Sequence, residues 1–99
     1  MYRLTIQYQT PADPETFDTR YFEQHVPLCR PLPGLRAASF SKPRKLGDGT
    51  APYLVAEFDF DDAAALKSAL RSPEMAVVAK DAETLPAERV MFTAEIIGG

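Results

Sequence analysis

The sequence predicts an α+β fold of the ferredoxin-like βαββαβ type, and three observations support this prediction. Segments that alternate apolar and polar residues, as strands with one buried face do, are separated by two helical regions with recognisable start signals. No repeat, low-complexity tract or linker interrupts this order. The 99 residues provide for one domain, 1–99, with a single core. We therefore expect one antiparallel sheet that carries both helical regions on one face.

The first strand and the first helix have the clearest local signals. Residues 2–9 alternate without fault between apolar and polar side chains, which predicts a strand with one buried face. Asp13 is a good N-cap, and Pro14 suits the first position of a helix. We therefore expect a helix over residues 14–30.

The second half of the chain predicts a β-hairpin, a helical region and a last strand. We expect a weaker strand over 35–46, a turn over 47–50, a strand over 53–60, a helix from about 62 to 70, a second helical start at Ser72 and Pro73, and a strand over 88–97. Pro43 cannot donate a hydrogen bond to a neighbouring strand, so it suits a sheet edge or a strand end.

Composition excludes several classes of function. The chain has a formal net charge of -3 and a pI of about 5.0, so it lacks the basic surface that nucleic acid requires, and an anionic membrane would repel it. Neither a membrane-spanning run nor a signal peptide is expected, since Met1 leads directly into a strand pattern. A single cysteine, Cys29, permits no internal disulfide, and we expect a cytoplasmic protein.

The only histidine, His25, is the most informative candidate for a functional site. On a helix that turns about 100° per residue, His25 falls near the middle of the apolar half. A side chain that exchanges protons near neutral pH would therefore point into the interior, as a general acid or base or as a donor to a carbonyl. Alternatively, it is a core histidine bonded to a backbone carbonyl. Pro27 removes one helical hydrogen bond and predicts a kink or an early end near His25.

The last strand predicts a second copy of the chain as a partner. Val90, Phe92 and Ala94 would lie on one face of this strand, and Met91 and Ile97 on the other. A strand that is apolar on both faces needs cover on both. Since both helical regions would occupy one side, the chain has no third layer of its own. We expect a homodimer through the helix-free face of the sheet.

The motif Phe17-x3-Tyr21-x3-His25-Val26-Pro27-Leu28, followed by Leu32-Pro33-Gly34-Leu35, resembles the EthD family, which is named for its association with ethyl tert-butyl ether degradation. Ser72-Pro73-Glu74 and Asp81 support the resemblance, which covers essentially the whole chain. It implies a dimeric α/β barrel, in which two ferredoxin-like sheets pack face to face. It also implies a cleft for small organic molecules between sheet and helices. The same group includes cofactor-free monooxygenases, muconolactone isomerases and polyketide-type cyclases.

By this resemblance, His25 matches the helix histidine of the family, and we expect it to act with Tyr21 as the catalytic pair. Phe17, Leu28, Phe40 and Phe58 are the candidates for contacts with substrate, although packing in the core is the plainer interpretation of such side chains. The expected function is binding and conversion of a small apolar or aromatic oxygenated metabolite, by isomerisation, cyclisation or cofactor-free oxidation. The alternative is a non-catalytic carrier, or an accessory subunit of a degradation enzyme.

No cofactor is expected, and no metal site is expected because the chain has no second histidine. Cys29 lies four residues after His25 on the same helical face and could be a nucleophile with His25 as its base. A buried, inert thiol is the plainer interpretation.

Overall fold

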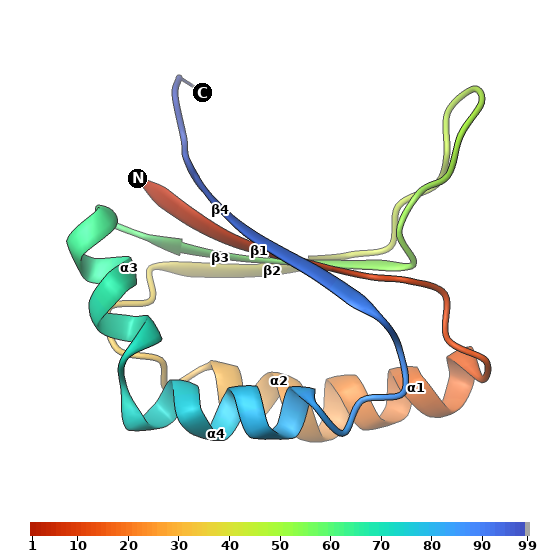
Figure 1. Cartoon of the computed structure of the whole chain (residues 1–99), viewed down its shortest axis with the longest axis horizontal. Helices are drawn as coiled ribbons and strands as arrows, with labels where there is room; N and C mark the ends of the chain where they lie inside the picture. Colours follow the sequence, from red (N-terminus) through yellow and green to blue (C-terminus); the bar gives the residue numbers. More distant parts are fainter. Residues whose placement is uncertain (99) are drawn as a thin grey trace.

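The computed structural model describes residues 1–98 and shows one sheet with its helices on a single face (Figure 1). The elements are β1 (Tyr2–Tyr8), α1 (Pro14–Arg20), η1 (Tyr21–His25), α2 (Val26–Cys29), β2 (Ala37–Ser41), β3 (Leu54–Phe60), α3 (Ala63–Leu70), α4 (Pro73–Ala82) and β4 (Arg89–Glu95). The expected order is confirmed, with α1, η1 and α2 as the first helical region and α3 and α4 as the second. None of the helices within residues 1–98 is long and apolar enough to span a bilayer.

The sheet has the strand order β2-β3-β1-β4, and every pairing is antiparallel. The central strand β1 places Tyr2 opposite Phe60 of β3 and opposite Glu95 of β4. Strands β1 and β2 are not neighbours, and neither are β3 and β4, because a helical crossover joins each of these pairs. This is the ferredoxin-like α+β arrangement that the sequence predicts.

Two strands are shorter than their sequence patterns indicate. Strand β2 ends at Ser41, opposite Val55, whereas the pattern extended to residue 46. It is an edge strand, and Pro43 soon follows with no amide to donate. Strand β4 ends at Glu95, where its partner β1 begins. The apolar pattern does not show where a partner strand stops.

The first helical region does not stop at Pro27. The side chain of Asp13 accepts a hydrogen bond from the Thr16 amide at 3.2 Å, which confirms the expected N-cap. The helix then continues to Cys29 through a π-helical turn, η1, whose closing amide at Val26 bonds to the carbonyl of Tyr21, five residues earlier. A wider turn directly before Pro27 gives room to the proline ring, which would otherwise press on the preceding turn.

The π-helical turn also fixes which side chains face the sheet. Phe17, Tyr21, His25 and Cys29 are spaced four residues apart and are all buried. In an unbroken α-helix each step of four residues overshoots a full turn by about 40°, so this row would rotate away from the sheet. One extra residue in η1 reverses that drift. The turn therefore keeps Tyr21 and His25 directed at the core.

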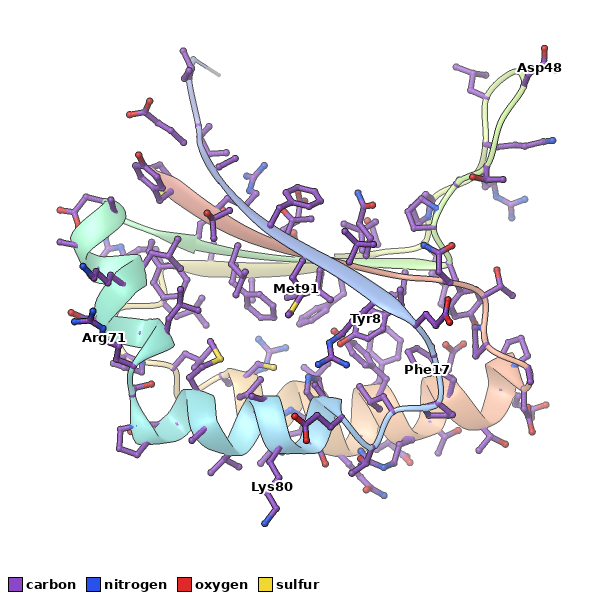
Figure 2. The ribbon with its side chains drawn as sticks, viewed as in Figure 1. Tyr8, Phe17, Asp48, Arg71, Lys80 and Met91 are labelled. Carbon is purple, nitrogen blue, oxygen red and sulfur yellow. The ribbon has the colours of Figure 1, made fainter. Side chains whose placement is uncertain are left out.

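The core lies between the helices and the facing side of the sheet. The side chains of Tyr8 and Phe17 meet there, with ring centroids 5.5 Å apart (Figure 2). Strand β4 is covered less well than β1 and β3. Its Met91 is paired with Ile6 and faces the same side, but remains 58% exposed. The side of β4 that faces the helices is therefore only partly covered.

The other face of the sheet bears no helix. On β4 it exposes Val90 and Phe92, which confirms that this strand is apolar on both faces. The centre of the same face is charged instead, because Arg3 of β1 bonds to Asp59 at 2.7 Å and pairs with Glu57 at 3.4 Å.

Candidate functional site

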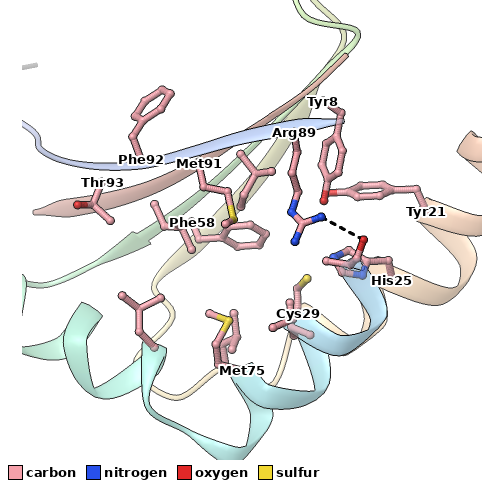
Figure 3. Close-up of a pocket in the computed structure, with 17 residues that line it drawn as sticks. Tyr8, Tyr21, His25, Cys29, Phe58, Met75, Arg89, Met91, Phe92 and Thr93 are labelled. Carbon is pink, nitrogen blue, oxygen red and sulfur yellow. Dashed lines mark hydrogen bonds between the residues drawn. The ribbon is translucent and has the colours of Figure 1, made fainter. Parts of the chain in front are cut away.

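A cavity of about 440 Å³ lies between the helix side of the sheet and the helices (Figure 3). Its walls come from β1, the first helical region, α4 and β4, and most of the lining side chains are apolar. The lining residues with polar groups are Tyr8, Tyr21, His25, Cys29, Arg89 and Thr93. Small-molecule sites commonly measure about 300–1,000 Å³ and combine apolar walls with a few polar groups, so this cavity has the character of a ligand site.

His25 is held in the cavity wall by a carboxylate. Its Nδ1 lies 2.8 Å from Oδ2 of Asp81 on α4, and the residue is 3% exposed. The partner of this nitrogen is therefore a side chain that is 56 residues away in sequence, and not a backbone carbonyl. A histidine oriented by a carboxylate is the usual arrangement for proton transfer.

Asp81 is itself fixed by Arg20 of α1. The Arg20 guanidinium donates to both carboxylate oxygens, at 2.8 and 3.1 Å, and also bonds to Thr84. These bonds from Arg20 hold the pKa of Asp81 below its ordinary value, with a smaller contribution from His25. Asp81 is thus an anion at neutral pH.

The charge on Asp81 determines the tautomer of a neutral His25 ring. An ionised carboxylate only accepts hydrogen bonds, so Nδ1 must carry the proton and donate it. Nε2 is then the unprotonated nitrogen. Because His25 lines the cavity and Asp81 does not, Nε2 is the ring nitrogen available to a bound molecule.

Tyr21 packs beside the histidine, and Tyr8 packs beside Tyr21. The ring of Tyr21 lies 5.2 Å from that of His25 and 5.3 Å from that of Tyr8, centroid to centroid. Burial raises the pKa of Tyr8 to about 12 and also raises that of Tyr21. Both phenols therefore stay neutral at physiological pH, and they can offer hydrogen bonds but no charge.

Cys29 lines the same cavity but is poorly suited to be a nucleophile. Burial raises the pKa of its thiol to about 11, so the reactive thiolate is scarce at neutral pH. No hydrogen bond within residues 1–98 joins this thiol to His25, its expected base, whose Nδ1 is bound to Asp81. Among residues 1–98, no group of three or more His, Cys, Asp and Glu side chains is arranged to hold a metal ion.

The structure brings together some of the residues singled out from the sequence. His25, Tyr21 and Phe58 line the cavity, whereas Phe17, Leu28 and Phe40 do not. Phe17 is fully buried and stacks on Tyr21 at 5.6 Å, and Phe40 meets Phe58 edge to face at 5.8 Å. Leu28 is half-buried against the core. Phe17 and Phe40 therefore pack behind residues that line the cavity.

Sequence reasoning did not identify two polar residues of the site. Asp81 was named only as support for the family resemblance, because no pattern in the neighbouring sequence predicts its contact with His25. Arg89 opens β4, lies opposite Tyr8 and lines the cavity. Its signal was present in the alternation of the last strand, which places residues 89 and 91 on one face.

Comparison with known proteins places the chain in a family. A model of the EthD domain matches residues 9–86. An uncharacterised 11.0 kDa protein from the thcB-thcC intergenic region of Rhodococcus erythropolis is 41% identical over 76 residues, covering 75% of this chain and 73% of that protein. The crystal structure of an EthD family protein from Bacillus halodurans has a TM-score of 0.89 at 30% identity, over 98% of this chain and 99% of that one.

More distant structures share the fold alone. SnoaB, a cofactor-independent oxygenase from Streptomyces nogalater, has a TM-score of 0.73 at 15% identity, over 99% of this chain and 94% of that one. A dimeric ferredoxin-like protein of unknown function from Thermobifida fusca has a TM-score of 0.71 at 14% identity, over 96% and 90% of the two chains.

Proposed function

The chain belongs to the EthD family, and we propose that it binds a small, largely apolar oxygenated molecule in the sheet–helix cavity and moves a proton on it with His25. One observation carries this proposal. The only histidine of the chain lies in the wall of an apolar cavity, with one ring nitrogen bound to an ionised carboxylate and the other available.

The proposed proton transfer uses Nε2 of His25 as the base. It takes a proton from an acidic C–H or O–H group of the ligand, and the imidazolium that forms keeps its Nδ1–H bond to Asp81. The negative charge of Asp81, held in place by Arg20, stabilises this imidazolium. Return of the proton to another atom of the same molecule completes an isomerisation or a cyclisation without any change of oxidation state.

Neighbouring residues supply orientation and a dry environment. Tyr21 and Tyr8 remain neutral and can donate hydrogen bonds to a carbonyl oxygen, while Phe58 and the other apolar side chains exclude water. Proton removal could also prepare a substrate for reaction with dioxygen. That SnoaB, which shares this fold, is a cofactor-independent oxygenase is compatible with such chemistry.

Exchange of carbon-bound protons tests the proposal without knowledge of the natural substrate. 2-Tetralone, an aromatic ketone with acidic α-protons, would be incubated with the protein in D2O and followed by NMR. We expect acceleration by the wild type and a loss of about 100-fold or more in His25→Gln, the usual range for a general base. Phe22→Leu, at a 40% exposed position outside the cavity lining, is the control and should keep the wild-type rate.

Two results would count against proton transfer. If 2-tetralone binds and its exchange is not accelerated, the protein acts as a carrier for this class of molecule. If His25→Gln accelerates exchange as the wild type does, another group is the base.

We also propose that two chains pair through the helix-free face. Val90 and Phe92 of β4 are 52% and 44% exposed there, and the protein from Thermobifida fusca that shares this fold is described as dimeric. The charges of Arg3, Asp59 and Glu57 are already paired within one chain, which lowers the cost of covering them.

A further inference from the structure

Arg89 places a positive charge in the cavity. The side chain extends from β4 towards the helical segment that carries His25 (Figure 3). Its Nη1 donates to the carbonyl of Ala82 at 3.4 Å, a long bond. Its Nε is buried and has no hydrogen-bond partner within residues 1–98. The edge of the guanidinium formed by Nε and Nη2 thus makes no hydrogen bond to protein groups within these residues.

Capping of α4 explains only part of this placement. Ala82 is the last residue of α4, and a cation at the carboxyl end of a helix is favourable. That role uses Nη1 alone. It does not explain why Nε is taken out of water, where an unpaired donor is costly, particularly on a charged group.

No anionic side chain within residues 1–98 forms an ion pair with Arg89. None of the ion pairs within the described part of the chain involves it. Asp81, which approaches the cavity from α4, is already bound to Arg20 and His25. The other polar side chains of the lining are Tyr8, Tyr21, His25, Cys29 and Thr93, and burial keeps the phenols and the thiol uncharged at neutral pH.

We infer that the ligand of this cavity is an organic acid whose carboxylate is bound by Nε and Nη2 of Arg89. Two parallel N–H donors on one edge of a guanidinium match the two oxygens of a carboxylate, and the pair is strongest where water is excluded. The apolar walls would hold the rest of the molecule. The inference rests on the proposed function, since it requires that the cavity holds a ligand.

A matched pair of probes tests the charge requirement. 2-Naphthoate and 2-naphthamide have nearly the same shape, but only the first is an anion at pH 7. We expect the wild type to bind 2-naphthoate at least about tenfold more tightly in calorimetric titrations, the scale of a charged hydrogen bond. Arg89→Gln should remove this preference and keep the affinity for 2-naphthamide within about threefold of the wild-type value. Arg89→Lys keeps the charge but lacks the two parallel N–H donors, so its preference should lie between those of the wild type and Arg89→Gln.

Controls separate this site from general electrostatics and from the proton-transfer proposal. Arg44→Gln makes the same change in net charge at an exposed loop position and should keep the preference. His25→Gln should also keep it, while it loses proton exchange on neutral 2-tetralone. Equal affinity of the wild type for both probes would overturn the inference, as would an unchanged preference in Arg89→Gln or equal weakening of both probes. If neither probe binds the wild type, the organic-acid assignment fails, and 2-tetralone exchange decides the proposed function independently.

Discussion

Replacing Asp81 with asparagine tests the network that orients His25. The substitution keeps the size of the side chain but removes its charge. It weakens two bonds from Arg20, at 2.8 and 3.1 Å, and one from His25, at 2.8 Å. A hydrogen bond to a charged group contributes about 1.5–3 kcal/mol when buried. Here the side chains of Arg20 and Asp81 are 25% and 20% exposed, so solvent screens part of this energy.

The asparagine oxygen can still accept one hydrogen bond, so we expect Asp81→Asn to lower the free energy of unfolding by about 1–2 kcal/mol at pH 7. In a domain of this size that corresponds to a fall in Tm of about 4–12 °C. Urea denaturation and thermal melts at equal protein concentration would measure it, since a dimer makes Tm depend on concentration. Asp61→Asn is the control, because Asp61 pairs with Arg36 where both side chains are more than 60% exposed: 64% and 63%. Equal stability of the two variants would mean that the Asp81 carboxylate does not stabilise the fold more than an exposed ion pair does.

Three further predictions concern the same features. Arg20 and His25 lower the pKa of Asp81 in the folded state, so their contribution to the free energy of unfolding is present above about pH 4 and is lost as the pH falls through the folded-state pKa. The free energy of unfolding should therefore fall more steeply with acid in the wild type than in Asp81→Asn. His25→Leu leaves the Arg20–Asp81 pair intact, so unfolding in urea should show a loss no larger than about 1.5 kcal/mol, and strong destabilisation with normal ligand binding would contradict the catalytic role. Sedimentation should give twice the chain mass of 11.0 kDa. The dimer interface should bury more than roughly 1,000 Å² of total surface. Val90→Glu should give monomers. Val77→Glu is the control and should stay dimeric, because Val77 is equally 52% exposed but lies on α4. A monomeric wild type at micromolar concentration would contradict the dimer.

The fold was accessible to sequence reasoning because its signals are local. The N-caps at Asp13, Asp62 and Ser72 all accept hydrogen bonds from the amides three residues on, as the capping patterns predict. Alternation over β1 and β3 likewise identifies the buried face of each strand. Such signals require only a few neighbouring residues.

The π-helical turn before Pro27 was not predicted, because it depends on burial of the whole helix. Pro27 alone indicates a kink or an early end near His25. The structure interrupts the α-helix there with η1, which keeps Tyr21, His25 and Cys29 against the sheet, and the helical region ends at Cys29. The regular spacing of four residues between apolar or aromatic positions was the available signal.

The candidate site was predicted only in part. His25 and Tyr21 were identified by their helical face and by the family resemblance. The partner of His25, Asp81, lies on another helix, and its contact follows only from the packing of α4. The position of Arg89 depends on the register of β4 against β1, which fixes the face on which it lies.

The proposed proton transfer requires that His25 presents an unprotonated Nε2 to a ligand while Nδ1–H is held by Asp81. Since His25 is the only histidine, ¹⁵N-histidine labelling gives one pair of ring signals and needs no assignment. At a pH where the ring is neutral, we predict NMR shifts of the Nδ1–H tautomer, and a change confined mainly to Nε2 when 2-tetralone is added. A ring protonated on Nε2, with both nitrogen signals unchanged by saturating 2-tetralone, would contradict both the tautomer and the contact with the ligand.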